Sequence, residues 1–223
     1  MRTLYLHGFA SGPSSTKGVV FERHFAARGV AIERLDLRVP SFEHLRLSAM
    51  IDAVTARLAE RTVLIGSSLG GLTAARVAER FGPEAQPLGS VSRGRDRRGA
   101  AVVLMAPAFH LADRWREVLG DEWETWRQTG WREITDYTTG KPARVDFGFV
   151  EDVAAIDVGL PELAVPALVL HGTRDDVVPI ERSRDFQRAN PQARLVELDD
   201  GHELVASLPR LLGETEAFLE ALA

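Results

Sequence analysis

The sequence contains no cysteine, and this absence excludes several kinds of chemistry. The chain forms no disulfide, holds no thiolate-ligated zinc and uses no cysteine nucleophile, so a nucleophile is sought among serine, threonine, lysine and the carboxylates. No run of roughly 18 apolar residues occurs either, and the apolar run at the start ends at His7. The sequence therefore predicts neither a transmembrane helix nor a signal peptide, and we expect a cytoplasmic protein.

The sequence also has no excess of positive charge. Lys and Arg number 27 against 32 Asp and Glu, which gives a formal net charge of −5. Nucleic acids and anionic membranes are bound by broad basic surfaces, so we expect neither as a partner. The 223 residues, 45% of them hydrophobic, are enough for one well-packed domain, and we expect residues 1–223 to form a single domain that carries an insertion.

Short apolar runs alternate with longer amphipathic stretches along the chain. This alternation predicts an α/β fold, in which helices cover both faces of a mostly parallel sheet. Helical spacing of apolar residues predicts a helix over 43–60, with Ser41 as a possible cap, and another that follows Ser207 to the end of the chain. The predicted strands are Thr3–Leu6, Ala31–Leu35, Thr62–Ile65, Ala101–Met105, Ala167–Leu170 and Arg194–Leu198.

Two segments interrupt the alternation. Residues 84–99 are polar and rich in Gly and Arg, which predicts a surface loop. Residues 107–160 contain all four tryptophans in what reads as helical sequence, and we predict a cap over the carboxyl edge of the sheet. Six aromatic side chains of the cap either line an apolar pocket or pack the cap onto the sheet: Phe109, Trp115, Trp123, Trp126, Trp131 and Tyr137.

A glycine-flanked serine stands between a predicted strand and a predicted helix. The sequence at 66–70 is Gly-Ser-Ser-Leu-Gly, and only Ser68 satisfies both glycine positions of the G-x-S-x-G pattern. A β-carbon at Gly66 or Gly70 would collide with neighbouring backbone in so sharp a turn. We therefore predict Ser68 as a nucleophile and the N–H of Leu69, at the positive end of the following helix, as one oxyanion donor.

The first predicted strand ends in a short loop that starts with His7, Gly8 and Phe9. A second oxyanion donor has to come from a loop other than that of the serine, and the N–H of Phe9 or Ala10 is the natural source. We expect His7 to hold this loop by hydrogen bonds rather than to take part in chemistry.

Acid and base residues come late in the chain, each after a predicted strand. Asp175 and Asp176 follow one strand, and His202 follows the next. A serine hydroxyl needs a base to take its proton, and a carboxylate to hold that base in the correct tautomer. We assign these roles to His202 and Asp175, with Asp176 as the alternative carboxylate.

The sequence lacks the residues that three other types of site require at fixed positions. A dinucleotide fingerprint needs glycine where Ser68 stands, and a phosphate-binding P-loop needs glycine before Lys17. A zinc helix built on His202 and Glu203 would need a second histidine where Ala206 stands. We expect no cofactor and no metal.

Taken together, these residues resemble the α/β-hydrolase superfamily, in which the nucleophile, carboxylate and histidine follow one another in the order Ser68, Asp175, His202. The His-Gly-x-x-Asp pattern that ends at Asp175 is similar to the family's, and the His-Gly-Phe opening looks most like its small bacterial esterases. The resemblance implies a shortened sheet of about six mostly parallel strands, a site at their carboxyl ends, and oxyanion donors at Phe9 and Leu69. Because the first strand begins near residue 1, we expect the family's common leading antiparallel strands to be missing, which leaves an edge exposed and is compatible with a monomer or a homodimer.

The leading hypothesis is a serine hydrolase that cleaves small or medium carboxylic esters through an acyl-enzyme. An acyltransferase, a thioesterase or a peptidase would use the same residues, because all share the nucleophile, the base and the oxyanion hole. A non-catalytic binding module with the same fold is a third hypothesis, against which the intact set of Ser68, Asp175 and His202 argues.

Overall fold

The structure is a computed structural model of the chain, and it describes residues 1–81, 86–87 and 99–222. A parallel sheet forms its centre, with strand order β2-β1-β3-β5-β8-β9, and a short strand β4 pairs with the first residues of β5. All six predicted strands are present and pair in parallel, so the predicted α/β fold with a mostly parallel sheet of about six strands is confirmed. The strands are β1 (Arg2–Leu6), β2 (Ile32–Leu35), β3 (Arg61–Ser67), β4 (Gln86–Pro87), β5 (Gly99–Met105), β8 (Ala167–Gly172) and β9 (Ala193–Leu198).

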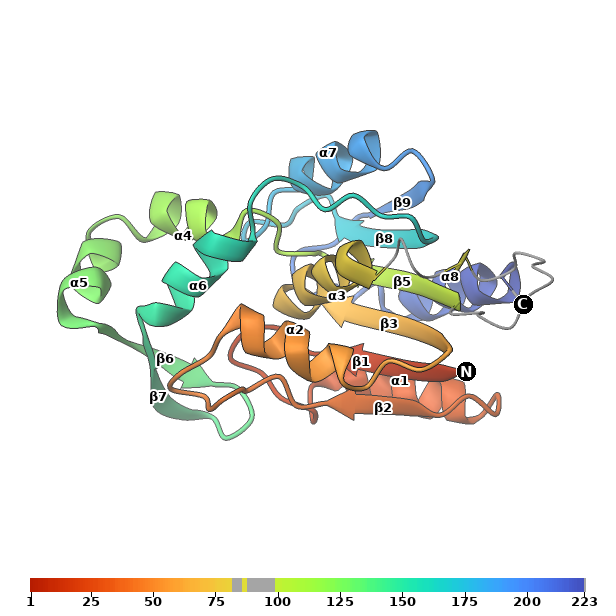
Figure 1. Cartoon of the computed structure of the whole chain (residues 1–223), viewed down its shortest axis with the longest axis horizontal. Coiled ribbons are helices and arrows are strands. Elements are labelled where there is room, and N and C mark those ends of the chain that lie inside the picture. Colours follow the sequence, from red (N-terminus) through yellow and green to blue (C-terminus); the bar gives the residue numbers. More distant parts are fainter. Residues whose placement is uncertain (82–85, 88–98, 223) are drawn as a thin grey trace.

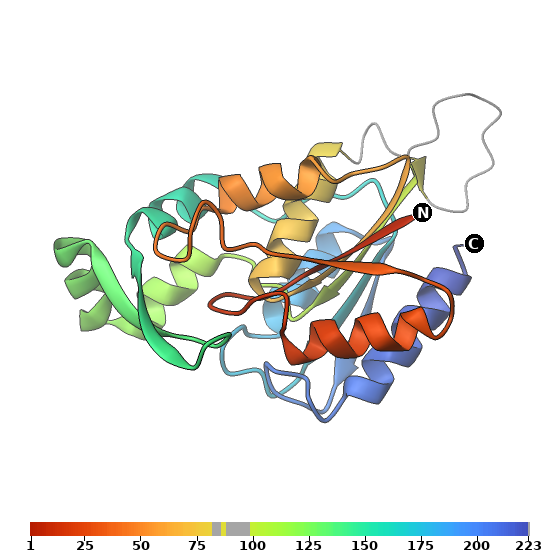
Figure 2. The same cartoon turned by 90° about the horizontal axis from the view of Figure 1, so that it is seen from below.

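Helices cover both faces of this sheet, as Figures 1 and 2 show. On one face, α1 and α8 bury Phe21, Phe25 and Leu211 against alternate strand residues; on the other, α2, α3 and α7 pack against the remaining ones. Strand side chains point alternately to the two faces, and both faces are covered, which explains the nearly continuous apolar runs of the sequence. The helices are α1 (Thr16–Ala26), α2 (Leu47–Thr55), α3 (Leu69–Phe81), α7 (Glu181–Ala189) and α8 (Leu208–Glu220).

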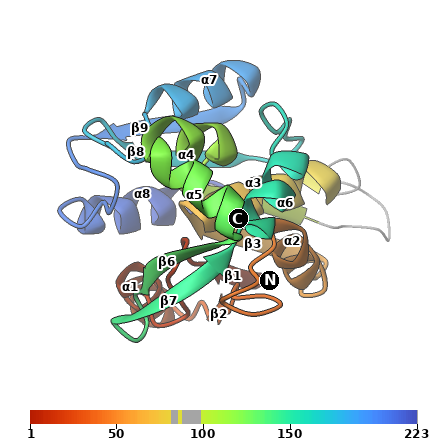
Figure 3. The same cartoon turned by 90° about the vertical axis from the view of Figure 1, so that its left-hand side faces the viewer.

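The chain between β5 and β8 forms a separate group of elements at the carboxyl ends of the strands. Figure 3 looks onto this end of the sheet, and α5 with the hairpin β6–β7 lies in front of it. The elements of the insert are α4 (Leu111–Leu119), α5 (Asp121–Thr129), β6 (Trp131–Asp136), β7 (Lys141–Asp146) and α6 (Gly148–Ile156).

Buried and half-buried ion pairs attach the insert to the rest of the fold. Arg76 of α3 and Asp157, which follows α6, are both buried, and they pair at 3.0 Å. Asp157 also accepts a hydrogen bond from the N–H of Leu111, at the start of α4, at 2.9 Å. At the hairpin, Asp146 accepts two hydrogen bonds from Arg46, at 2.7 and 3.0 Å. The insert is therefore held against the rest of the fold at Asp157 and at the hairpin.

Three details differ from the predictions. Trp131 begins a strand rather than a helix, because Gly130 ends α5 in the left-handed conformation and the polar, β-branched sequence that follows forms a hairpin. The helix expected over 43–60 spans only Leu47–Thr55, since Arg46 is extended and tied to the hairpin. Within the loop expected over 84–99, Gln86–Pro87 form β4, and the other residues up to 98 lie outside the described part of the chain.

No helix within the described residues combines the length and the apolar character that crossing a membrane requires.

Candidate active site

Ser68 lies in a strained turn between β3 and α3. Its φ angle of +54° is in the left-handed region, which a residue other than glycine adopts at a cost in energy. The N–H of Ser68 donates to the carbonyl of Met105, at 2.9 Å, so the turn is held by the neighbouring strand. A β-carbon at Gly66 would lie 2.2 Å from the Gly70 carbonyl oxygen, and one at Gly70 would lie 2.2 Å from the Leu6 oxygen. Only glycine fits at either position, and this close approach exposes the serine hydroxyl above the sheet.

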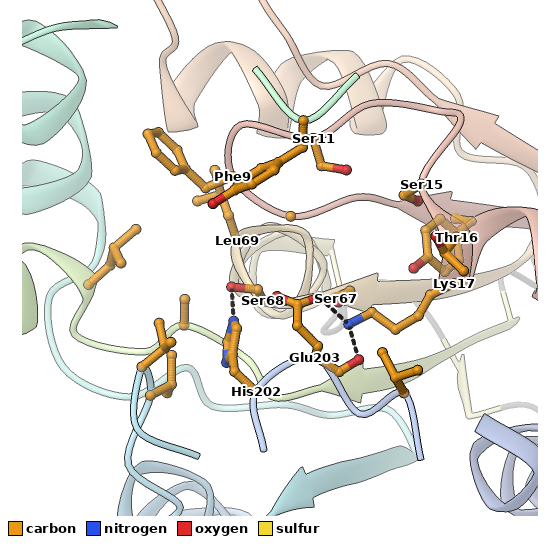
Figure 4. A pocket seen from close by; sticks show the side chains of 18 of the residues that line it. Phe9, Ser11, Ser15, Thr16, Lys17, Ser67, Ser68, Leu69, His202 and Glu203 are labelled. Carbon is orange, nitrogen blue, oxygen red and sulfur yellow. Dashed lines mark hydrogen bonds and ion pairs between the residues drawn. The ribbon is translucent and has the colours of Figure 1, made fainter. Parts of the chain in front are cut away.

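The structure brings the three predicted catalytic side chains into one hydrogen-bonded chain, although they come from three loops. Ser68 Oγ lies 3.1 Å from His202 Nε2, and His202 Nδ1 lies 2.8 Å from Asp175 Oδ2. An ionised carboxylate only accepts hydrogen bonds, so Nδ1 carries the proton and Nε2 is left to accept the serine hydroxyl. The dashed line in Figure 4 marks the contact between serine and histidine.

The Asp175 carboxylate is fully buried and has several donors. Its Oδ1 accepts the N–H groups of Val177 and Val178 at 2.9 and 2.7 Å, and its Oδ2 also lies 3.1 Å from Nε2 of the buried His171. Burial by itself would raise the pKa of Asp175, but the hydrogen bonds from His171 and His202 outweigh it and hold the pKa below its ordinary value. The group therefore stays ionised beside His202.

The neighbouring Asp176 is placed differently. Asp176 is exposed. Its backbone carbonyl contacts the insert by accepting a hydrogen bond from Arg114 of α4 at 2.9 Å. Arg114 also donates to the carbonyl of Val177, at 3.1 Å. Of the two candidate carboxylates, Asp175 is thus the one that contacts His202, and Arg114 connects its loop to the insert.

The loop after β1 lies against the serine. A β-carbon on Gly8 would be 3.4 Å from both the Ser67 carbonyl oxygen and Ser68 Cβ. His7 is buried and anchors the loop: its Nε2 accepts the N–H of Leu37, and its Nδ1 donates to the carbonyl of Gly8, each at 2.9 Å. Burial lowers the pKa of His7, which favours the neutral imidazole that this pair of bonds requires.

Phe9 and Leu69, the predicted oxyanion donors, line the same cavity as Ser68. Within the described part of the chain, the N–H of neither residue donates a hydrogen bond. Leu69 is the first residue of α3, where backbone N–H groups have no partner inside the helix. Neither N–H group thus has a hydrogen-bond acceptor within the described residues.

A cavity of about 750 Å³ opens beside Ser68 and His202. Its wall combines apolar side chains from the insert and the β1 loop with polar ones from the start of α1. The hairpin turn closes one side, because the N–H of Tyr137 donates to the carbonyl of Ala10, at 2.8 Å. Residues along the wall include Phe9, Leu69, Leu111, Trp115, Val178, Ser15, Thr16, Lys17 and Glu203.

Of the six aromatic residues considered as pocket wall, Trp115 and Tyr137 line the cavity. The other four have packing partners. Phe109 stacks on Phe186. Trp126 is buried and donates its indole N–H to the carbonyl of Val145 at 3.0 Å. Trp123 packs on Phe147 and Trp131 on His44. Trp123 and Trp126 therefore pack within the insert, whereas Phe109 and Trp131 pack against residues of the rest of the fold.

Sequence reasoning gave no role to two residues of this site. His171 belongs to the His-Gly-x-x-Asp pattern, and its spacing of four residues from Asp175 on an otherwise apolar strand is a signal for a partner of that carboxylate. In the sequence, Lys17 stands out only because a P-loop would need a glycine before it. In the structure its ammonium group reaches the cavity, as Figure 4 shows. Nothing in the local sequence places the start of α1 beside Ser68; the order of the strands does.

Among the described residues, no group of three or more His, Asp or Glu side chains is arranged to hold a metal ion.

Solved structures with the same architecture were found among hydrolases. A putative hydrolase from Agrobacterium vitis S4 has a TM-score of 0.79 at 22% identity, with 97% of this chain and 87% of that chain covered. The α/β hydrolase domain-containing protein 10 from mouse has a TM-score of 0.76 at 17% identity and coverage of 99% and 90%. Est1E from Butyrivibrio proteoclasticus has a TM-score of 0.74 at 19% identity and coverage of 99% and 87%. Likeness at these identities establishes the fold.

No protein with a curated description matches the sequence. A sequence family does: the model of the family described as "Uncharacterised protein family (UPF0227)" matches residues 2–219. Since this match spans nearly the whole chain, the protein belongs to the UPF0227 family and has the α/β-hydrolase fold.

Proposed function

We propose that the protein is a serine hydrolase that cleaves small or medium carboxylic esters through an acyl-enzyme intermediate. One observation carries the proposal. An unbroken hydrogen-bonded chain runs from Ser68 through His202 to the buried Asp175, and its serine end opens into a cavity. Structures described as an esterase from Thermogutta terrifontis and as the esterase domain of a Rhodothermus marinus protein share the fold, which supports the choice of reaction class.

In the first half of the reaction, Ser68 Oγ attacks the carbonyl carbon while its proton passes to His202 Nε2. The N–H groups of Phe9 and Leu69 stabilise the oxyanion that forms. When the tetrahedral intermediate collapses, the bond to the alkoxy group breaks, and His202 returns the proton to the departing alcohol.

In the second half, water attacks the acyl-enzyme and His202 takes its proton, after which Ser68 leaves with that proton and the carboxylic acid is released. Asp175 stays ionised throughout and accepts the Nδ1–H of His202, so the imidazole keeps the tautomer that both halves need.

The apolar part of the wall supports an acyl group of moderate size. Phe9, Leu111 and Trp115 lie along it, and a cavity of about 750 Å³ is within the range of sites for small molecules. A series of p-nitrophenyl esters of increasing chain length measures the preferred acyl length. Product analysis in the presence of alcohol or amine acceptors distinguishes a hydrolase from an acyltransferase.

The proposal is tested with a fluorophosphonate probe and the Ser68→Ala variant. The wild-type protein should be labelled covalently at Ser68. The variant should keep its circular dichroism spectrum, lose the labelling and lose turnover by a factor of up to roughly a million. Ester hydrolysis by the variant at the wild-type rate would refute the mechanism.

A further inference from the structure

The wall of the cavity differs on the two sides of Ser68, and we call the side with Phe9 and Leu69 the apolar half and the side with Thr16 and Lys17 the polar half. In Figure 4, Phe9 and Leu69 lie on one side of Ser68, while Thr16 and Lys17 lie on the other. The proposed reaction gives a role to the apolar half, because an acyl chain packs there. It gives none to the polar half, whose composition is unusual for a wall that only contacts hydrocarbon.

The polar half is built around the first turn of α1, an 11-residue helix. The N-cap residue Ser15 makes no side-chain capping bond, and within the described part of the chain the N–H groups of Thr16, Lys17 and Gly18 donate no hydrogen bond. Unpaired N–H groups and the positive end of the helix dipole together attract a negatively charged group.

Lys17 adds a full positive charge to this turn. Only 12% of its side chain is exposed, and its ammonium group donates to the backbone carbonyl of Glu203 at 2.8 Å. The Glu203 carboxylate lies 3.6 Å away and is 77% exposed, so it is free to move into solvent. Burial lowers the pKa of Lys17, although the nearby Glu203 opposes the shift. The ammonium group thus has donors to spare and would gain from a second, better-buried anionic partner.

Two buried hydroxyl groups lie at the start of α1, and neither makes a well-formed hydrogen bond. Tyr5 is 1% exposed and lines the cavity; its hydroxyl is close to those of Ser15 and Ser67, but neither it nor Ser15 Oγ reaches hydrogen-bond geometry within the described residues. A buried hydroxyl without a well-formed hydrogen bond is unfavourable, so this side of the cavity has hydrogen-bonding capacity that a water or a ligand would satisfy. Tyr5 belongs to β1, so the position of its hydroxyl is independent of the helix and of the lysine.

We propose that the polar half binds a carboxylate of the substrate, so that the preferred ester carries a negative charge on one side of the scissile bond. Lys17 and the N-terminus of α1 hold the carboxylate while Ser68 attacks the ester carbonyl. A carboxylate fits better than a phosphate dianion, because one lysine matches one charge and the side chain of Glu203 adds negative charge nearby. This inference rests on the proposed function, which supplies the ester reaction.

Two matched pairs of substrates test the proposal, one for each side of the ester. The first is 4-(butyryloxy)benzoate against 4-(butyryloxy)benzamide, with the charge on the leaving alcohol. The second is mono-4-nitrophenyl adipate against 4-nitrophenyl methyl adipate, with the charge on the acyl group. The quantity measured is the ratio of kcat/KM for the charged ester to that for its neutral match. In at least one pair, Lys17→Gln should lower this ratio about tenfold or more, and Lys17→Arg should keep it within about threefold of wild type.

A purely structural role predicts another result. Lys17 also ties the loop that carries His202, through the carbonyl of Glu203. If that were its only role, Lys17→Gln would slow both members of each pair by the same factor and leave both ratios unchanged, which would overturn the proposal.

Binding without turnover separates this proposal from the proposed function. In a Ser68→Ala background, titration calorimetry with the two charged esters measures Kd directly. Adding Lys17→Gln should raise the Kd of at least one of them about tenfold. If hydrolysis turns out not to depend on Ser68 and this difference persists, the function is wrong and the carboxylate site stands. Equal Kd values with and without Lys17 for both esters would refute the site.

Discussion

His171 Nε2 lies 3.1 Å from Asp175 Oδ2, the same carboxylate oxygen that receives His202 Nδ1 at 2.8 Å. One oxygen is thus held between two imidazoles. Nε2 of His171 also lies 2.9 Å from the carbonyl of Val178, and since both neighbours are acceptors, this nitrogen must be the donor. On its other side, His171 Nδ1 lies 2.7 Å from Ser183 Oγ. His171 therefore fixes the position of Asp175 from the interior of the protein.

Removing this donor should slow the reaction without weakening substrate binding. We expect His171→Leu to lower kcat about 10- to 100-fold, the equivalent of one hydrogen bond to a charged group, and to leave KM within about threefold. His171→Gln should be milder, because the Gln amide nitrogen can donate from nearly the same place. Steady-state kinetics on a p-nitrophenyl ester, with thermal unfolding to confirm that both variants are folded, measures this. Equal losses in the two variants would show that the donor itself is unimportant.

The two adjacent aspartates should respond very differently to loss of charge. Asp175→Asn should lower kcat by roughly 10⁴, because an amide presents its N–H to His202 Nδ1 and favours the wrong tautomer. Asp176→Asn should change kcat less than about threefold, since Asp176 is exposed and its backbone makes the contact with Arg114. Parallel measurement of kcat for the two variants decides the assignment, and the reverse ranking would contradict it.

The low pKa of Asp175 should make stability depend on pH. Its pKa in the folded protein lies below its ordinary value of 3.8, so the ionised carboxylate stabilises the fold above about pH 4. This contribution is lost as the pH falls below 3.8 toward the folded-state pKa. The free energy of unfolding in urea should therefore be higher for wild type than for Asp175→Asn at pH 5 to 7, and the gap should narrow from pH 4 downward. A gap that widens on acidification would contradict this.

Two Gly→Ala substitutions should have effects of opposite sign. Gly70→Ala places a β-carbon 2.2 Å from the Leu6 carbonyl oxygen, so β1 and α3 must move apart, and we expect a loss of about 2–4 kcal/mol in unfolding free energy. Gly213→Ala in α8 meets no atom within 4 Å and should stabilise the protein by about 0.5–1 kcal/mol through the higher helix propensity of alanine. Urea unfolding curves measure both. Similar stability of the Gly70→Ala variant and wild type would show that the turn has room for a side chain.

Much of the fold could be predicted from the sequence because it depends on local rules. Apolar runs mark strands wherever both faces of a sheet are covered, and all six appear where they were expected. The turn at Ser68 is equally local, since glycine at 66 and 70 is demanded by backbone atoms only a few residues away or on the adjacent strand. The hairpin β6–β7 was missed because its helical surroundings and tryptophans suggested a helix.

What only the tertiary structure decided is which side chains from distant loops come together. Composition and spacing led to Ser68, His202 and a choice between two aspartates, and the path of the loop after β8 places Asp175 rather than Asp176 against the imidazole. The position of Lys17 likewise depends on where β1 lies in the sheet, because that places the first turn of α1 beside Ser68. A hydrogen bond acts over about 3 Å, whereas these residues are separated by many positions in the chain, so only the packed sheet determines which of them meet.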